Sequence, residues 1–129
     1  MARAAGHMAA DVLHMIAEHV RPGVSTEALD RLCHDYIVNV QKAVPANVGY
    51  LGFPKTVCTS LNHVVCHGIP SPGQVLRDGD ILNIDVAVIK DGWYGDTSRM
   101  YLVGAVSPLA RRLVDTTLEA MLAGIAQVK

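Results

Sequence analysis

Residues 83–101 read NIDVAVIKDGWYGDTSRMY, and this stretch decides the fold. The pair Asp91-Gly92 predicts a two-residue hairpin turn, because a type I′ turn needs a positive φ at both of its central positions. The Val- and Ile-rich residues on one side and the aromatic and β-branched residues on the other predict the two strands. Asp85 and Asp96 interrupt these strands, although Asp is among the poorest strand formers. The stretch therefore predicts a hairpin that carries two carboxylates for a reason other than strand stability.

The turn fixes which residues face each other across the hairpin. The expected pairs are Lys90 with Trp93, Ala87 with Asp96, and Asp85 with Ser98. Because successive side chains point to opposite faces, Asp85 and Asp96 lie on the same face as diagonal neighbours, roughly 7–8 Å apart at the backbone. At that separation the two carboxylates can converge on a metal ion or a metal pair. We expect no direct contact between them without one.

The two faces of the hairpin differ in polarity. One face of its first strand is apolar throughout and is expected to pack against helices; it comprises Leu82, Ile84, Val86 and Val88. The other face carries Asp85 and Asp96 and is expected to form the floor of a polar cleft. Two solvated carboxylates on an open sheet are the alternative, but like charges this close destabilise each other unless something neutralises them. We therefore favour a site for a divalent ion such as Mn²⁺, Co²⁺ or Fe²⁺.

Three helices are predicted from apolar spacing and from their end signals. The first runs up to Arg21-Pro22-Gly23, the second starts after the N-cap Ser25, and the third starts at Ser107-Pro108. Their apolar positions are Met8, Val12, Ile16 and Val20 in the first, Leu29, Leu32, Cys33, Tyr36, Ile37 and Val40 in the second, and Leu109, Leu113, Thr117, Met121 and Ile125 in the third. In the second helix, all of these positions are expected to face the core.

Short runs rich in Val, Ile and Thr predict four strands between the second and third helices, at residues 55–61, 64–68, 80–90 and 93–103. These runs follow one another without a regular alternation of strand and helix. We therefore predict the α+β class, with a mainly antiparallel sheet covered by helices on one face. Residues 1–129 are expected to form a single domain.

The composition argues against several classes of protein. Half of the 129 residues are hydrophobic, which is enough for a folded core. The formal net charge is −1 without a Lys/Arg cluster, and no apolar run approaches membrane-spanning length, so neither a nucleic-acid nor a membrane partner is expected. The three cysteines, Cys33, Cys58 and Cys66, form no C-x-x-C motif and are expected to be reduced, buried thiols in a cytoplasmic protein.

His67 is the next candidate for the cleft, since it stands at a predicted strand end before Gly68. A hydrogen-bonded core histidine is the alternative. Adjacent strand residues point to opposite faces, so Cys66 is not expected to pair with His67, whereas Cys58 on a neighbouring strand could approach it as a thiol partner. The histidines on the helices are expected at the surface; they are His7, His14, His19 and His34.

Three stretches resemble type I methionine aminopeptidases: residues 21–33, RPGVSTEALDRLC; residues 49–70, GYLGFPKTVCTSLNHVVCHGIP; and residues 76–101, LRDGDILNIDVAVIKDGWYGDTSRMY. The resemblance runs over essentially the whole chain. It implies the pita-bread fold, in which two αβ halves are related by a pseudo-two-fold axis. It also implies removal of the initiator Met from nascent chains with two divalent metal ions.

The resemblance assigns expected roles to individual residues. Asp85 and Asp96 are expected to be two of the five metal ligands, and His67 the histidine that contacts the scissile peptide group. Tyr50, Phe53 and Cys58 match residues that line the methionine side-chain pocket. Asn62 and Val64 match positions near a monovalent-cation site.

The family's remaining ligands, one His and two Glu, come from a second half that this sequence does not contain. We therefore expect an N-terminal half with part of the metal site, which binds Co, Mn, Fe or Zn ions weakly or singly. The expected partners are the N-terminal methionine of peptides and either the missing C-terminal half or a second copy of the chain. A non-catalytic half-fold that self-associates, or a binding module, is the alternative function.

Overall fold

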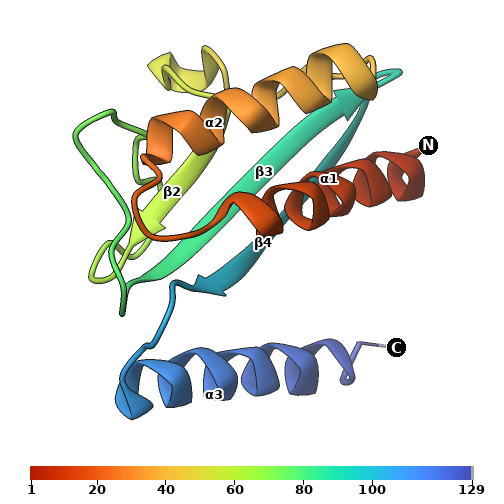
Figure 1. Ribbon diagram of the computed structural model, residues 1–129. Coiled ribbons are helices and arrows are strands. Elements are labelled where there is room, and N and C mark those ends of the chain that lie inside the picture. The colour runs from red at the N-terminus through yellow and green to blue at the C-terminus, as the bar shows by residue number, and fades with distance from the viewer. Residues whose placement is uncertain (129) are drawn as a thin grey trace.

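The computed structural model describes residues 1–128, which form one antiparallel sheet and three α-helices (Figure 1). Strand β3 (Ile81–Lys90) is central. Strand β4 (Trp93–Leu102) pairs along the full length of one edge of β3. Strand β2 (Val57–Leu61) and the two-residue strand β1 (Val44–Pro45) share the other edge. The predicted α+β class and antiparallel sheet are confirmed.

The β3–β4 hairpin has the predicted turn and register. Asp91 and Gly92 have φ values of 50° and 78°, as a type I′ turn requires. The three expected cross-strand pairs are all present, including Asp85 with Ser98. The predicted apolar face of β3 is completely buried; it comprises Leu82, Ile84, Val86 and Val88. The sheet therefore has one face in the core and one face that carries the two aspartates.

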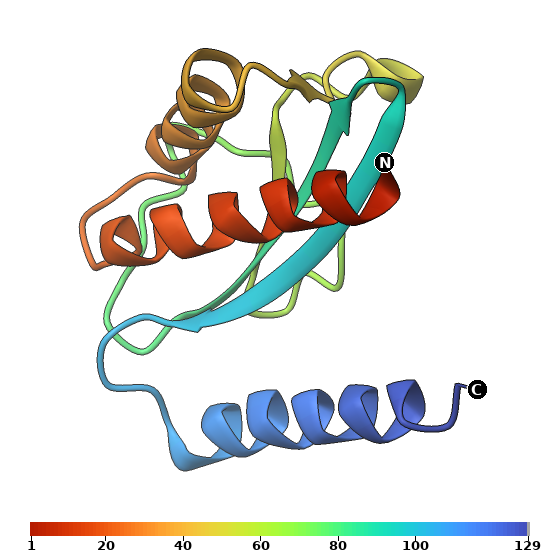
Figure 2. The same cartoon turned by 90° about the vertical axis from the view of Figure 1, so that its right-hand side faces the viewer.

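Helices α1 (Ala2–Ile16) and α2 (Thr26–Asp35) cover the apolar face of the sheet (Figures 1 and 2). A short 3₁₀ helix, η1 (Ala17–His19), continues α1, and a π-helical turn, η2 (Tyr36–Val40), continues α2. The predicted N-cap of α2 is confirmed, because the Ser25 hydroxyl accepts a hydrogen bond from the Ala28 N–H at 3.2 Å. None of the helices in the described part of the chain has the length and hydrophobicity needed to span a membrane.

Two of the predicted core positions of the second helix are wrong. Leu29, Cys33 and Ile37 are buried, whereas Leu32 is exposed and Val40 is 64% exposed. The buried residues recur every four positions, so a single stripe of the helix meets the sheet. The wider π-helical turn then changes the angular spacing and leaves Val40 in solvent.

The predicted strand at residues 64–68 is also wrong, since this segment is a loop in which Val65 is 93% exposed. Asn62 and His67 have φ values of 52° and 57°, in the left-handed region that an extended strand excludes. The chain turns twice here instead of pairing, although its Val-rich composition is typical of a strand.

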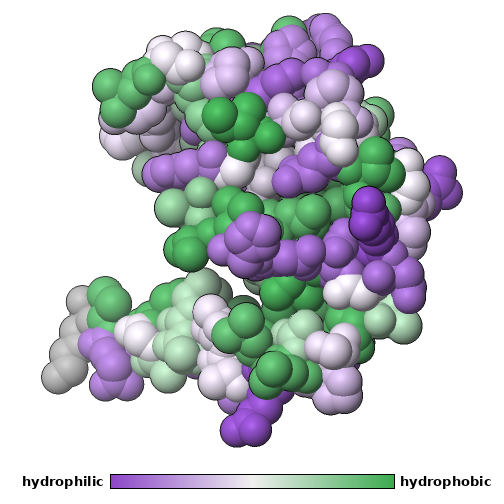
Figure 3. Space-filling model, turned by 90° about the vertical axis from the view of Figure 1, so that its left-hand side faces the viewer, coloured by the Kyte–Doolittle hydropathy of each residue, from purple (hydrophilic) through white to green (hydrophobic). Residues whose placement is uncertain are grey.

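Helix α3 (Pro108–Ile125) projects from the end of β4 and covers neither face of the sheet (Figures 1 and 2). It begins as predicted, with the Ser107 hydroxyl accepting from the Ala110 N–H at 3.2 Å. No residue of α3 is buried, and Leu109 is 77% exposed. Apolar side chains are therefore displayed along the projecting helix (Figure 3).

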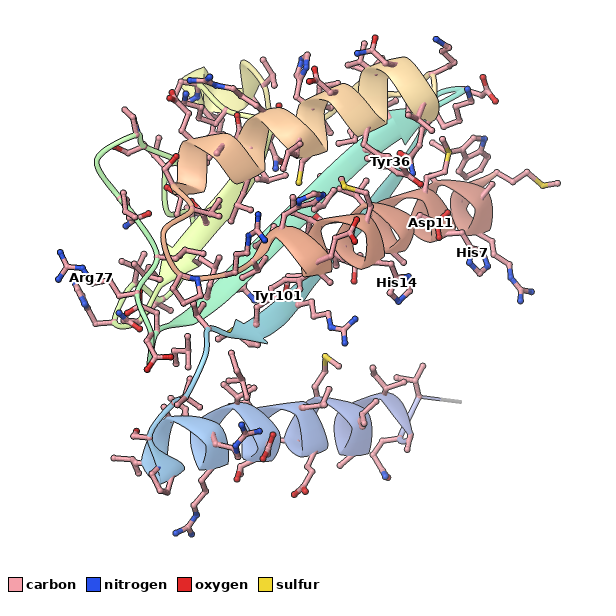
Figure 4. The ribbon with its side chains drawn as sticks, in the orientation of Figure 1. His7, Asp11, His14, Tyr36, Arg77 and Tyr101 are labelled. Atoms are coloured by element: carbon pink, nitrogen blue, oxygen red, sulfur yellow. The ribbon has the colours of Figure 1, made fainter. Side chains whose placement is uncertain are left out.

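Helix α1 lies unusually close to β4. A Cβ atom at Gly95 would stand 2.0 Å from the Ala5 carbonyl oxygen, so only glycine permits this approach. At the other end of the contact, the Tyr101 hydroxyl donates a 2.6 Å hydrogen bond to the Leu13 carbonyl oxygen (Figure 4). Burial raises the pKa of Tyr101 to about 12, which keeps the hydroxyl available as a donor.

The close approach of α1 to β4 predicts opposite effects for two glycine substitutions. Gly95→Ala is expected to lower the free energy of unfolding by about 1–3 kcal/mol, since the backbone of α1 has to move away. Gly6→Ala, in α1 itself, meets no atom within 4 Å and is expected to raise it by about 0.5–1 kcal/mol. Urea denaturation followed by circular dichroism measures both values. Equal stability of the two variants would contradict this packing.

Candidate functional site

A cavity of about 470 Å³ opens on the aspartate face of the sheet. Its lining comprises Asn47, Tyr50, Leu51, Gly52, Phe53, Pro54, Cys58, His67, Ile69, Asp85 and Asp96. The structure thus brings Asp85, Asp96 and His67 into one cavity with Tyr50, Phe53 and Cys58. Asn62 and Val64 do not line it.

The floor of the cavity is formed by neighbouring strands. Cys58 of β2, Asp85 of β3 and Ser98 of β4 form one cross-strand row, with Asp96 two positions along β4. The pKa of Asp85 is raised, first by burial and then by the neighbouring carboxyl of Asp96. The Asp96 carboxylate therefore lies close enough to raise the pKa of Asp85, as expected for two like charges on one face of the hairpin.

No basic side chain neutralises this pair within residues 1–128. The ion pairs there involve other carboxylates, such as Glu27, and neither Asp85 nor Asp96 takes part in one. The nearby His67 lowers the pKa of Asp85, which opposes the effects of burial and of Asp96. In this part of the chain, no group of three or more His, Cys, Asp and Glu residues stands in a metal-binding arrangement. The two aspartates are therefore an incomplete set of oxygen donors.

His67 is held over the cavity by the glycine that follows it. A Cβ atom at Gly68 would stand 2.1 Å from the Thr59 carbonyl oxygen, so the loop lies directly against β2. The Thr59 N–H donates to the Gly68 carbonyl at 2.8 Å, and the Gly68 N–H donates to the Ser60 hydroxyl at 3.2 Å. With its φ of 57°, His67 turns its side chain into the same cavity as Asp85.

Helix α2 holds the start of β2 in place through a carboxylate that the sequence analysis did not identify. Asp30 is buried, and its Oδ1 atom accepts hydrogen bonds from the N–H groups of Thr56 at 2.8 Å and Val57 at 3.0 Å. One turn earlier in α2, Glu27 pairs with Lys55 at 2.8 Å. These bonds fix the start of β2, and with it the loop that carries Tyr50 and Phe53.

Asn62 and Val64 lie in the turn that follows β2. The Asn62 amide donates to Asp80 at 2.9 Å and accepts from the Ile81 N–H at 3.0 Å, so its side chain is occupied in closing this turn. Asn62 also borders a second cavity, of about 350 Å³. Within residues 1–128, no hydrogen-bond donor reaches the backbone carbonyl oxygens of Asn62 and Val64.

The three cysteines differ, and the prediction that all are buried is wrong for Cys66, which is exposed. Burial raises the pKa of Cys33 to about 12. Burial and the charge of Asp85 raise the pKa of Cys58 to about 11. Cys58 shares the cavity with His67, but its raised pKa is the opposite of what an activated thiol nucleophile requires.

Thiol labelling should distinguish the three cysteines. At about pH 8 we expect iodoacetamide to alkylate Cys66 rapidly and to leave Cys33 and Cys58 unmodified, because both are buried and protonated. Mass spectrometry after proteolysis identifies the labelled residue, and a Cys66→Ser variant serves as the control. Rapid labelling of Cys58 in the folded variant would contradict the cavity floor described above.

The sequence profile of metallopeptidase family M24 matches residues 1–129. Over 127 residues, the chain is 56% identical to a methionine aminopeptidase of Escherichia coli K12 and 55% identical to one of Rickettsia prowazekii. Each alignment covers 98% of this chain and 48% of the relative. The chain therefore spans about half the length of these curated relatives.

Solved structures agree with the sequence relatives. The structure of methionine aminopeptidase from R. prowazekii matches with a TM-score of 0.92 at 56% identity, over 95% of this chain and 49% of that chain. The enzyme from Thermotoga maritima matches with a TM-score of 0.93 at 31% identity, over 97% of this chain and 50% of that chain. An Xaa-Pro dipeptidase from Bacillus anthracis, at 22% identity and a TM-score of 0.83, shares the fold. The expected half of a pita-bread fold is confirmed, and the chain belongs to metallopeptidase family M24.

Proposed function

We propose that this chain supplies the N-terminal half of a methionine aminopeptidase active site, which removes methionine from the N-terminus of nascent polypeptides. The observation that carries the proposal is the single cavity that joins Asp85, Asp96 and His67 to an apolar wall. The methionine aminopeptidases that match this chain at 56% identity support the choice of substrate. Because nascent chains emerge from ribosomes, this function also implies a cytoplasmic location.

The chemistry of the cavity floor fits divalent metal ions. Asp85 and Asp96 lie on one face of the hairpin and form no ion pair within residues 1–128, and paired carboxylates of this kind suit Co, Mn, Fe or Zn. Lewis-acid activation of the peptide bond is the chemistry that such ions supply when bound. Two carboxylates are too few for two ions, so this half alone would hold one ion weakly.

The chain's own residues would bind and orient the peptide. Tyr50, Phe53 and Cys58 offer the methionine side chain an apolar wall with a polarisable thiol. His67 would donate a hydrogen bond to the oxygen of the scissile peptide group as negative charge develops there. The free carbonyl oxygens of Asn62 and Val64 would bind a monovalent cation outside this cavity.

A complementary half is the partner that this proposal requires. The chain covers 48% of its relatives, and α3 displays apolar side chains that the described residues do not cover. The same helix supports a second candidate function, self-association of a non-catalytic half-fold. A homodimer related by a two-fold axis would replace the approximate symmetry of two unlike halves.

We expect the isolated chain to show little or no methionine aminopeptidase activity, because two-metal hydrolysis needs both ions held near each other. Hydrolysis of a Met-Ala-Ser peptide with added Co²⁺ or Mn²⁺ measures this, alone and after mixing with the C-terminal half of the E. coli enzyme. Activity that appears on mixing should disappear with His67→Ala and persist with His14→Ala, which changes an exposed histidine on α1 (Figure 4). Strong turnover by the purified monomer, lost in His67→Ala, would show that this half is sufficient.

Sedimentation velocity tests whether the chain forms a homodimer. Burial of α3 in a homodimer predicts a dimer at tens of micromolar that Leu113→Asp/Met121→Asp converts to monomer, since both side chains are exposed on α3. The matched variant His7→Asp/His14→Asp places the same charges on the exposed side of α1 and is expected to leave the dimer intact. A monomer at all these concentrations would exclude the homodimer and leave the complementary half as the partner.

A further inference from the structure

Leu51 is an apolar residue in an unfavourable position at the mouth of the cavity. It is 91% exposed, and its φ of 48° lies in the left-handed region. Leucine rarely adopts this conformation, because its Cβ atom then crowds the following carbonyl oxygen. The glycines on either side of this turn, Gly49 and Gly52, both have a φ of 81° and allow the chain to present the side chain outward.

The loop around Leu51 is well braced. It contains the short helix η3 (Tyr50–Gly52). The Gly49 N–H donates to the Phe53 carbonyl at 2.8 Å, and the Phe53 N–H donates to the Tyr50 carbonyl at 2.9 Å. The Asn47 amide ties the base of the loop to the Thr56 carbonyl at 3.2 Å. Leu51 is therefore held in solvent by a closed network of hydrogen bonds.

Ile69 provides a second apolar side chain at the cavity. It is 54% exposed and lines the same cavity as Leu51. Its position is fixed by Gly68, which lies against β2. Two braced loops thus present apolar side chains next to a floor that carries two carboxylates.

The size of the cavity indicates which part of a peptide would meet this rim. A sphere of 470 Å³ is about 10 Å across, and an extended chain advances about 3.3 Å per residue, so roughly three residues fit in a space of this size. The carboxylates, His67 and the apolar wall take up the first residue and the bond that follows it. The third residue then reaches the mouth, where Leu51 is almost fully exposed.

We propose that Leu51 and Ile69 form an apolar clamp for the side chain of the third residue of the peptide, with a preference for large apolar side chains there. This inference rests on the proposed function, because it assumes that the N-terminal methionine occupies the wall of Tyr50, Phe53 and Cys58. The clamp adds specificity downstream of the cleaved bond. Contact with the peptide also explains why Leu51 is held exposed in a strained conformation.

NMR titration of the chain with four tripeptide amides tests the clamp without requiring turnover. Met-Ala-Phe amide is expected to bind about 5–10-fold more tightly than Met-Ala-Ser amide, because the clamp buries one apolar side chain. Leu51→Ser should reduce this ratio to less than about twofold, and Ile69→Ser should reduce it as well. Leu109→Ser changes an exposed leucine on α3 and should leave the ratio unchanged.

The other two peptides, Ser-Ala-Phe amide and Ser-Ala-Ser amide, separate the clamp from the proposed function. If Met-Ala-Ser amide binds more tightly than Ser-Ala-Ser amide but the Phe preference is absent or survives Leu51→Ser, the clamp is wrong and the methionine site stands. If Ser-Ala-Phe amide binds as tightly as Met-Ala-Phe amide, the methionine site is wrong. Failure of every peptide to bind at about 10 mM would overturn the clamp.

Discussion

Side-chain alternation along β3 is the constraint on which the rest of the structure depends. Each apolar residue of β3 that points into the core is followed by one that points to the opposite face of the sheet, so Asp85 stands between the buried Ile84 and Val86. If the register of the hairpin shifted by one residue, the aspartates would point into the core and the apolar residues of β3 would be exposed. Because burial of an ionised carboxylate is very costly, the hydrophobic core and the cavity floor specify the same register.

The packing of helices on the apolar face and the position of the aspartates on the other face therefore depend on each other. Gly95 lets α1 approach β4 closely enough to cover the apolar face of the sheet. The next residue along β4 is Asp96, which points to the cavity face. Asp30 plays a related part for β2, since it joins α2 to the strand that carries Cys58. Helices α1 and α2 thus position the site from the other face of the sheet, and neither contributes a side chain to the cavity lining.

Local signals made much of the fold predictable from sequence. The Asp91-Gly92 turn set the hairpin register, and the hydroxyls of Ser25 and Ser107 marked the starts of two helices, because each effect acts within a few residues. The resemblance to methionine aminopeptidases supplied the grouping of Tyr50, Phe53 and Cys58 with the aspartates.

Features that depend on distant partners were not predictable in the same way. The need for glycine at position 95 is set by the Ala5 carbonyl, which lies 90 residues earlier in the chain. The role of Asp30 depends on two N–H groups of a different element. The loop at 64–68 has the composition of a strand, and only its contact with β2 through Gly68 shows why it turns. Helix α3 is likewise exposed because no other element within residues 1–128 buries any of its residues, and the apolar spacing of its own sequence does not reveal this.

Under the proposed function, a divalent ion would bind at the carboxylates that the alternation along β3 places on the cavity floor. Paramagnetic broadening of backbone amide signals during a Mn²⁺ titration locates such an ion directly. A Mn²⁺ ion bound at these carboxylates should broaden the signals of Cys58, Asp85 and Asp96 most strongly. This broadening should disappear in the Asp85→Asn/Asp96→Asn variant while the fold is retained. Broadening centred elsewhere, such as on the exposed side of α1 near Asp11, or unchanged broadening in the double variant, would contradict binding at these carboxylates.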